Sequence, residues 1–335
     1  MYDCLIVGGG FAGLQAAIQL GRYRYSVLVV DKGRGRSTLC GNYRNIIGWP
    51  DGVSGDRLRS LGRAQAESYG VHFIQDEVIG AARHGEGFEL ALGSSGGSCR
   101  GRTLLIATGI SDRYPAIPRL EEKLGHSVFV CPDCDGYETA GKRTLVLGSG
   151  TAGAGMALTL RHWCEDLVYV NHERQAIGSA QLDELQAQGI AYIEMEIAEV
   201  LDGSEERLAA AEAHGGAGEQ GESSERDGKV LPVASSFGGV LLKDGTVLRG
   251  SRGFIAFGGN QVHSDWAVHL GVERMENRHI VTDPRTKRTH VPGVWAAGDI
   301  GVHAEQSVIA MGEGAQAAIW MHKELSRRRK QSSDY

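Results

Sequence analysis

Two cysteines spaced by two residues, with a carboxylate directly behind them, are the residues of this chain best suited to do chemistry. They are Cys131 and Cys134, followed by Asp135. A Cys-x-x-Cys alone is consistent with half of a zinc site or with a redox pair. Zinc needs a second Cys or His pair at short spacing, and the remaining cysteines are scattered singly, so we expect no metal. Asp135 favours the redox interpretation because it could exchange a proton as a thiol becomes a thiolate.

Length and composition favour two globular domains in a reducing compartment. The 335 residues exceed one average domain, and a formal net charge of −6 gives no reason to expect nucleic acid or an anionic membrane as a partner. No uncharged apolar stretch is long enough to span a bilayer. The N-terminus runs straight into an apolar segment without a basic leader, which predicts a cytoplasmic protein. In such a compartment a Cys-x-x-Cys more often serves as a working redox pair.

A glycine-rich turn near the N-terminus lies in the order strand, turn, helix, strand. An apolar strand is expected at residues 4–7, the turn GGGFAG fills 8–13, helical spacing covers 14–20, and a second strand at 26–30 ends in Asp31. In this context a Gly-x-Gly-x-x-Gly predicts a dinucleotide site, with Asp31 placed to bind ribose hydroxyls.

Each glycine of that turn has a separate task. Gly8 makes the tight turn, Gly10 lets a pyrophosphate approach the backbone, and Gly13 lets helix and strand pack closely. The helix N-terminus then offers free N–H groups and a partial positive charge to the phosphates.

The same pattern recurs at a fixed offset, which predicts a second, altered nucleotide site. Positions 8, 10 and 13 shifted by 140 give Gly148, Gly150 and Gly153, flanked by apolar strands at 144–147 and 167–170. The same shift takes residue 31 to Asn171, so a neutral amide replaces the ribose-binding carboxylate.

The residues after this second strand suit neither nicotinamide cofactor. NADH favours an acid at the strand end, and NADPH favours Arg or Lys for its 2′-phosphate. Arg174 could reach a phosphate, but Glu173 would oppose it by about 3 kcal/mol at about 5 Å and an effective dielectric near 20. Two interpretations stay open: the site binds NAD(P)H through unfamiliar contacts, or it is empty or holds another nucleotide. A second flavin is the natural candidate, because the loop would still hold its pyrophosphate.

Two further segments complete a resemblance. Residues 289–299 read THVPGVWAAGD and resemble the flavin-binding segment of two-dinucleotide-domain flavoproteins, and residues 103–109 resemble their Ala-Thr-Gly strand end. The order flavin loop, Cys-x-x-Cys-Asp-Gly, second loop, Gly-Asp and helix resembles the low-molecular-weight thioredoxin reductases across nearly the whole chain. The resemblance implies an α/β fold of two Rossmann-like domains, the second inserted into the first, and a homodimer.

The resemblance also implies domain limits. We expect an FAD-binding domain from residues 1–114 and 248–326, and a central NAD(P)H-type domain at 115–247 that carries the Cys-x-x-Cys. Residues 202–228 are poor in large apolar side chains and predict a flexible surface insertion. For residues 327–335 we expect a solvated basic tail without a function. The alternatives are that the tail docks an acidic electron carrier or that Tyr335 stacks on a flavin.

Roles for individual residues follow from the same resemblance. Cys134 would lie against the flavin C4a, Cys131 would attack thioredoxin or a small disulfide, and Asp135 would be the acid–base group. The residues expected to contact FAD are Gly8, Gly10, Phe11, Ala12, Gly13, Asp31, Lys32, Asn45, Val78, Thr108, Gly109, Gly298, Asp299, Gln306 and Ser307. Those expected at the second nucleotide site are Gly148, Gly150, Thr151, Ala152, Gly153, Asn171, Arg174 and Gly258.

Departures from the family pattern indicate its pyridine-nucleotide-independent branch. The family's His-Arg-Arg run at the second site is missing, and Glu305 stands where reductases usually carry Arg. That branch includes ferredoxin-linked reductases, dithiol oxidases and diflavin-linked disulfide oxidoreductases. Dithiol oxidases commonly have His after the second cysteine, where this chain has Asp135, so the diflavin-linked kind fits best. The alternatives are an NAD(P)H-dependent thioredoxin reductase with an unusual pocket and a flavin-holding redox sensor without turnover.

Overall fold

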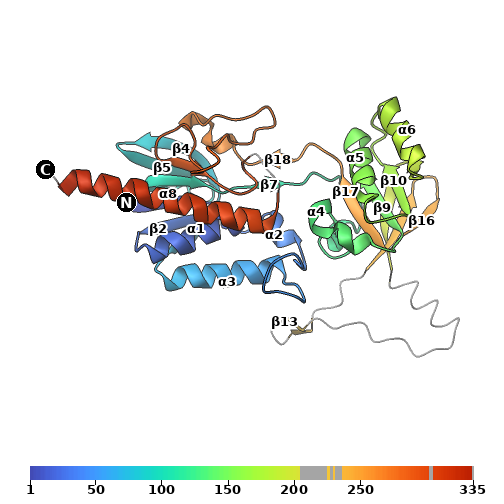
Figure 1. The fold of residues 1–335 in the computed structure, drawn as a ribbon, viewed down its shortest axis with the longest axis horizontal. Helices are drawn as coiled ribbons and strands as arrows, with labels where there is room; N and C mark the ends of the chain where they lie inside the picture. Colours follow the sequence, from blue (N-terminus) through green and yellow to red (C-terminus); the bar gives the residue numbers. More distant parts are fainter. Residues whose placement is uncertain (204–224, 227–228, 231–235, 302–304, 334–335) are drawn as a thin grey trace. The chain divides into compact units, whose positions relative to one another are not determined.

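The computed structural model describes residues 1–203, 225–226, 229–230, 236–301 and 305–333. The insertion expected at 202–228 therefore lies largely outside the described residues, as does Tyr335. The chain forms two compact units, Met1–Ser111 with Asn260–Tyr335, and Asp112–Gly259. Both ends of the chain thus build the first unit, and the second is inserted within it (Figure 1).

The first unit is built on a seven-stranded sheet in the order β3-β2-β1-β6-β5-β4, with β19 also paired to β6. Strands β3, β2, β1, β6 and β19 run parallel, and β5 and β4 add an antiparallel edge. Their bounds are Tyr2–Val7 (β1), Val27–Asp31 (β2), His72–Gln75 (β3), Val78–His84 (β4), Gly87–Leu92 (β5), Ser98–Ile106 (β6) and Val294–Ala296 (β19).

The central strands are apolar on both faces, as parallel strands covered on both sides require. In β1, Cys4 and Ile6 belong to the core beneath the helices, whereas Leu5 and Val7 belong to the core on the opposite face. The helices of this unit are α1 (Phe11–Arg22), α2 (Arg36–Leu39), α3 (Gly55–Ser68), the 3-10 turn η3 (Asp265–Leu270) and α8 (Ser307–Ser333).

Helices α1 and α8 lie side by side on one face of this sheet (Figure 1). They approach closely at Gly314, where a Cβ would come within 2.1 Å of the Ala12 carbonyl oxygen. Only glycine permits that separation, so the sequence of α8 allows its first turns to lie directly on the first turn of α1.

The second unit repeats the pattern with a five-stranded parallel sheet in the order β11-β10-β9-β17-β8. Its strands are Val128–Phe129 (β8), Thr144–Gly148 (β9), Leu167–Asn171 (β10), Ala191–Ile193 (β11) and Arg252–Ala256 (β17). Its described helices are the 3-10 turns η1 (Glu121–Lys123) and η2 (Gly136–Thr139) and the helices α4 (Pro132–Asp135), α5 (Gly150–Leu160) and α6 (Ser179–Ala187). The predicted α/β fold of two Rossmann-like units is confirmed.

The described residues also form three smaller sheets. An antiparallel sheet joins β12 (Ile197–Asp202), β15 (Phe237–Leu242) and β16 (Val247–Arg249), and β13 (Glu225–Arg226) pairs with β14 (Lys229–Val230). Strands β7 (Ile110–Ser111) and β18 (Gln261–Val262) form a pair at the edge of the first unit. Because β17 hydrogen-bonds to β9, it belongs to the second unit, although the division expected at 247/248 assigned it to the flavin domain. Among the described helices, none has both the length and the hydropathy needed to cross a bilayer.

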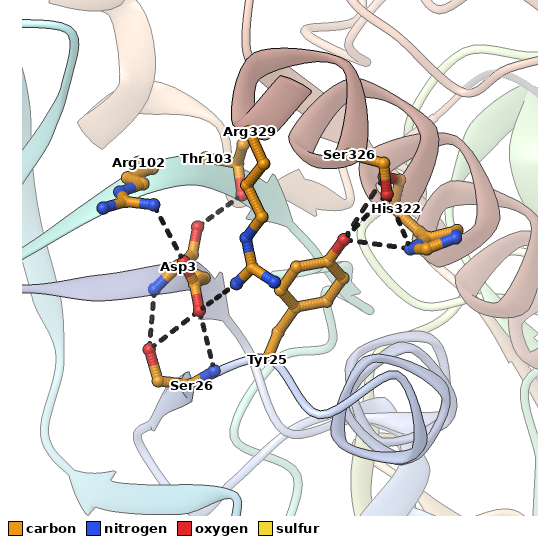
Figure 2. Close-up of polar contacts among 8 residues, drawn as sticks. All are labelled: Asp3, Tyr25, Ser26, Arg102, Thr103, His322, Ser326 and Arg329. Atoms are coloured by element: carbon orange, nitrogen blue, oxygen red, sulfur yellow. Dashed lines mark hydrogen bonds and ion pairs between the residues drawn. The ribbon is translucent and has the colours of Figure 1, made fainter. Parts of the chain in front are cut away.

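The solvated tail expected at residues 327–335 is wrong for residues 327–333, because these residues continue helix α8. Arg327 and Arg328 both donate to Glu324 at 3.0 Å. Arg329 reaches the Asp3 carboxylate at 3.4 Å, beside Arg102 at 3.3 Å (Figure 2). Much of this charge is therefore paired within the unit.

Tyr25 holds the same end of α8 from the other side. Figure 2 shows its hydroxyl pointing at the helix, 2.9 Å from His322 Nδ1 and 3.3 Å from Ser326 Oγ. Tyr23 stacks on the His322 ring with centroids 4.3 Å apart. Tyr25 itself is buried, so its hydroxyl and its partners depend on one another for hydrogen bonds.

We predict that Tyr25→Phe lowers the free energy of unfolding by about 1–2 kcal/mol, because it removes the hydrogen bonds of the Tyr25 hydroxyl to partly buried groups of α8. Urea denaturation measures this value. Tyr2→Phe is the matched control, because its hydroxyl contacts His72 Nδ1 at 3.0 Å on the exposed surface; it should change stability by less than about 0.5 kcal/mol. Equal effects of the two variants would contradict an anchoring role for Tyr25.

Candidate functional site

The redox pair is a disulfide at the start of a short helix. Cys131 is the N-cap of α4 and Cys134 lies in it, with Cα atoms 5.3 Å apart. Pro132 occupies the first helical position, where its missing N–H costs nothing. The Asp135 amide donates to the Cys131 carbonyl at 3.0 Å, so the carboxylate residue is tied to the same turn. Neither cysteine is buried, and both can be reached from solvent.

Gly136 allows this turn to pack closely against the rest of the second unit. A Cβ at residue 136 would come within 2.7 Å of the Trp163 ring, which follows α5. The Gly of the Cys-x-x-Cys-Asp-Gly motif is thus required by its packing against Trp163.

The first glycine loop has the predicted geometry. Gly8 has φ +105°, and a Cβ there would meet the Ala107 carbonyl oxygen at 2.3 Å, while one at Gly13 would meet the Gly8 oxygen at 1.9 Å. At Gly10 the nearest atom is Ser37 Oγ at 3.9 Å. The loop is therefore closed against the protein at Gly8 and Gly13 and open at Gly10, where a pyrophosphate would approach.

Helix α1 presents its N-terminus at that opening. It begins at Phe11, and no side chain caps it, so its first N–H groups are available to an anion. Asp31 lies at the end of β2 and accepts from the Gly9 amide at 3.0 Å and from Arg59 at 2.6 Å. Lys32 is exposed, 3.9 Å from Glu77. The sequence reading missed Arg59, which orients the Asp31 carboxylate from α3.

The C-terminal flavin segment lies beside this loop. Gly298 has φ +80°, and a Cβ there would lie 2.9 Å from Ala12 Cβ. Asp299 follows it and forms an ion pair with Arg36 at 3.5 Å. Arg36 also pairs with Glu305. The acid found where reductases usually carry Arg is thus matched by an arginine from α2, a residue that the sequence reading did not single out.

The start of α8 completes the set. The Gln306 carbonyl accepts from the Ala310 amide at 2.9 Å, and Ser307 is the first residue of the helix. Ser307 Oγ is buried and has no hydrogen-bond partner among the described residues. A buried hydroxyl without a partner is uncommon in folded proteins, and a ligand that reaches the helix start would satisfy it.

The remaining predicted flavin residues are more dispersed. Thr108 donates its hydroxyl to the His263 carbonyl at 2.7 Å, and Gly109 has φ +60°. Val78 is buried on β4. Asn45 is exposed between α2 and α3, and no described hydrogen bond joins it to the glycine loop. Its predicted role therefore has the least geometric support.

These residues fit an FAD. The opening at Gly10, the uncapped start of α1, the Asp31 carboxylate and the unpartnered Ser307 hydroxyl are the groups that a dinucleotide needs. When bound, FAD would supply two-electron chemistry to this unit.

The second glycine loop is covered by its own chain. Gly150 has φ +50°, and a Cβ there would meet Gln175 Cβ at 2.9 Å and the Ala176 oxygen at 3.4 Å. The corresponding position in the first copy, Gly10, has open space. Residues 175–176 therefore pack against the second loop at Gly150, and the first loop has no such neighbour among the described residues at Gly10.

The Asn171 side chain makes its hydrogen bonds to neighbouring residues of this loop and sheet. It is fully buried, its Oδ1 accepts from the Gly150 amide at 3.0 Å, and its Nδ2 donates to Gln175 O at 2.8 Å and to Tyr192 Oη at 3.0 Å. The Tyr169 hydroxyl donates to the Gly150 carbonyl at 2.8 Å. The amide thus holds the covering segment in place instead of facing a ribose.

Glu173 does not oppose Arg174, contrary to the expectation from the sequence. Arg113 binds it through two hydrogen bonds of 2.8 Å and also donates to the Gly258 and Phe257 carbonyls at 2.9 and 2.7 Å. The hydrogen bonds from Arg113 lower the pKa of Glu173 to about 2, although burial acts in the opposite direction. Arg174 instead lies 3.5 Å from Glu196.

The other second-site residues frame this pair. Thr151 is exposed on the first turn of α5, and Gly258 has φ +66° with a Cβ position 3.3 Å from Ala152 Cβ. At Gly153 a Cβ would lie 2.3 Å from the Tyr169 ring. Within the described part of the chain no cluster of three His, Cys, Asp or Glu side chains is suited to a metal ion.

Comparison with known proteins places this geometry in a family. Residues 2–314 match the model of the family described as pyridine nucleotide-disulphide oxidoreductase. The chain is 26% identical over 359 residues to a probable thioredoxin reductase of Arthroderma benhamiae, covering 99% of this chain and 82% of that protein. It is 26% identical over 328 residues to the thioredoxin reductase of Streptomyces coelicolor, covering 95% and 92%.

A solved structure agrees over the same length. The crystal structure of HlmI superposes with a TM-score of 0.81 at 28% identity, covering 99% of this chain and 94% of that one. A glycine loop built for FAD, a Cys-x-x-Cys disulfide and this likeness along the whole chain lead to one assignment. The chain belongs to the pyridine nucleotide-disulphide oxidoreductase family and is a thioredoxin reductase-like, FAD-dependent disulfide oxidoreductase.

Proposed function

We propose that this enzyme passes two electrons between FAD and the Cys131–Cys134 pair without taking them from NADPH or NADH. The observation that supports this is the covered second loop. Gln175 and Ala176 pack against Gly150 of that loop, and the Glu173 carboxylate lies at the same sheet edge, tied to Arg113 and to the Ser149 hydroxyl.

A nicotinamide nucleotide would have to undo these contacts in order to bind. It would displace residues 175–176 and break the hydrogen bond from Asn171 Nδ2 to the Gln175 carbonyl. Leaving one buried partner of such a hydrogen bond unsatisfied costs about 1–3 kcal/mol. Arg113 does not repay that cost, because it already binds Glu173 through two hydrogen bonds of 2.8 Å.

The chemistry then rests on the residues of α4. Two electrons break the Cys131–Cys134 bond and give two thiolates, and Asp135 supplies or accepts the proton that either sulfur exchanges. Cys131 attacks the disulfide of a partner, which releases one partner thiol and leaves a mixed disulfide. Cys134 resolves it, so that the partner leaves as a dithiol and the Cys131–Cys134 bond forms again. Each step is reversible, and a partner dithiol drives it backward.

The partner that we propose is thioredoxin or a small disulfide, in line with the names of the curated relatives. The electron donor is then a dithiol or a ferredoxin-like carrier, and the working form is a cytoplasmic homodimer. A second flavin in the altered loop is the occupant that best fits a retained Gly-x-Gly-x-x-Gly, and it would require residues 175–176 to move aside.

We predict that anaerobic addition of NADPH or NADH leaves the flavin absorbance of the FAD-loaded enzyme unchanged over minutes. A dithiol such as dithiothreitol should bleach it, because the route through Cys131–Cys134 does not use the second loop. Rapid bleaching by NADPH would identify a nicotinamide-dependent reductase with an atypical pocket. A flavin-to-chain ratio measured on the same sample separates one bound flavin from two. A flavin that exchanges electrons with no thiol would point to a redox sensor.

The roles of the two cysteines make a second prediction. With oxidised thioredoxin, Cys134→Ser should accumulate a mixed disulfide at Cys131, because the resolving thiol is missing, and Cys131→Ser should accumulate none. Nonreducing gel electrophoresis with mass spectrometry detects the adduct. Cys164→Ser is the control, because Cys164 is buried and donates to the Lys142 carbonyl at 3.1 Å. The opposite pattern would mean that the two roles are exchanged.

The Arg113–Glu173 pair predicts a pH-dependent contribution to stability. Its hydrogen bonds lower the pKa of Glu173 from 4.5 to about 2, so the ionised carboxylate stabilises the fold above about pH 4.5, and this contribution is lost as the pH falls toward 2. Glu173→Gln should therefore lower the urea midpoint at pH 7, and its midpoint should converge on that of the wild type as the pH falls.

Glu196→Gln is the matched control for this measurement, because Glu196 and its partner Arg174 are both about half exposed. Exposed ion pairs contribute little, so this variant should follow the wild type at every pH. A constant difference between Glu173→Gln and the wild type from pH 7 to pH 3 would show that the charge of Glu173 does not hold the loop.

A further inference from the structure

A buried ion pair lies behind the flavin segment of the first unit. Lys287 Nζ and Glu313 Oε1 are 2.8 Å apart, and the two side chains are only 6% and 8% exposed. Buried ion pairs seldom stabilise a fold more than a well-packed apolar pair would, because both charges lose their hydration. A contribution to the overall stability of the fold therefore does not explain why this ion pair is buried.

The second oxygen of the carboxylate indicates that role. Glu313 Oε2 accepts a hydrogen bond of 2.8 Å from the Gly298 amide. Gly298 itself is confined, because it has φ +80° and a Cβ there would lie 2.9 Å from Ala12 Cβ and 3.6 Å from Ala310 Cβ. One carboxylate thus joins α8 to the peptide that enters the Gly298–Asp299 turn.

Lys287 is held as firmly as the group that it binds. Its amide donates to the Asp283 carbonyl at 2.8 Å, and its carbonyl accepts from the Ala296 amide at 3.0 Å. Its backbone has φ +58°, which is uncommon for a residue other than glycine. The ammonium fixes one oxygen of Glu313, so that the other faces Gly298, and a hydrogen bond to an ionised acceptor is stronger than one between neutral groups.

We propose that Glu313, oriented by Lys287, is a positioning residue for the flavin: it fixes the Gly298 peptide and thereby directs the Asp299 carboxylate. Asp299 is the next residue of the chain and pairs with Arg36 at 3.5 Å. The inference rests on Asp299 lying against the flavin and is independent of the electron donor.

Two double variants separate positioning from charge. Lys287→Met with Glu313→Gln removes both charges but keeps a side-chain oxygen for the Gly298 amide. Lys287→Met with Glu313→Leu removes that acceptor as well. FAD affinity is measured by adding FAD to the apoprotein and following the quenching of flavin fluorescence. We expect the Leu variant to bind FAD roughly tenfold to a hundredfold more weakly, and the Gln variant to stay within about threefold of the wild type.

Tyr25→Phe is the control for a general loss of stability, because it weakens the far end of the same helix and touches neither Gly298 nor Asp299. It should lower the thermal midpoint of the apoprotein and leave the FAD affinity unchanged. Wild-type affinity in the Leu variant would overturn the proposal, and so would equal losses in the Gln and Leu variants. Because no donor or partner is present, a negative result here is distinct from a failure of the electron route proposed above.

Discussion

The contact between the first turns of α1 and α8 is the constraint on which the first unit depends. At Gly314 the two helices approach until no side chain fits between them, and Gly298 occupies the neighbouring space against Ala12. The N-terminal glycine loop, the Gly298–Asp299 turn and the start of α8 are thereby held together, although the last two are separated from the first by nearly the whole chain. A larger residue at position 314 or 298 would force apart the elements that make the flavin site.

The two glycine loops share one sequence motif, but the first is open to a ligand and the second is covered by residues of its own chain. In the first, the loop is open at Gly10 and an acid, Asp31, accepts from the loop amide while Arg59 orients it. In the second, Asn171 makes the same contact to a loop amide, but its Nδ2 group binds Gln175 and draws that residue over Gly150. Exchanging a carboxylate for an amide thus adds a donor, and the added donor holds the chain across its own loop.

Local sequence pattern was enough to predict the fold class, both glycine loops, the Cys-x-x-Cys turn and the altered character of position 171. Each of these features depends on residues that are close together in the sequence, so their spacing alone indicates it. The ion pairs around the sites were not predictable in this way. Arg113 and Glu173 are 60 positions apart, and Arg36 and Glu305 are 269 apart. Nothing near Glu173 indicated that its partner would be Arg113 and not Arg174, because only the folded sheet brings residue 113 to that edge.

The arrangement of the two units sets an order for biosynthesis. All of residues 112–259 are translated before β19 and α8, which the first unit needs for its sheet and for its contact with α1. The disulfide-bearing unit is therefore complete in sequence while the flavin unit still lacks β19 and α8. A chain cut short before α8 would therefore carry its cysteines without a complete flavin site to exchange electrons with them.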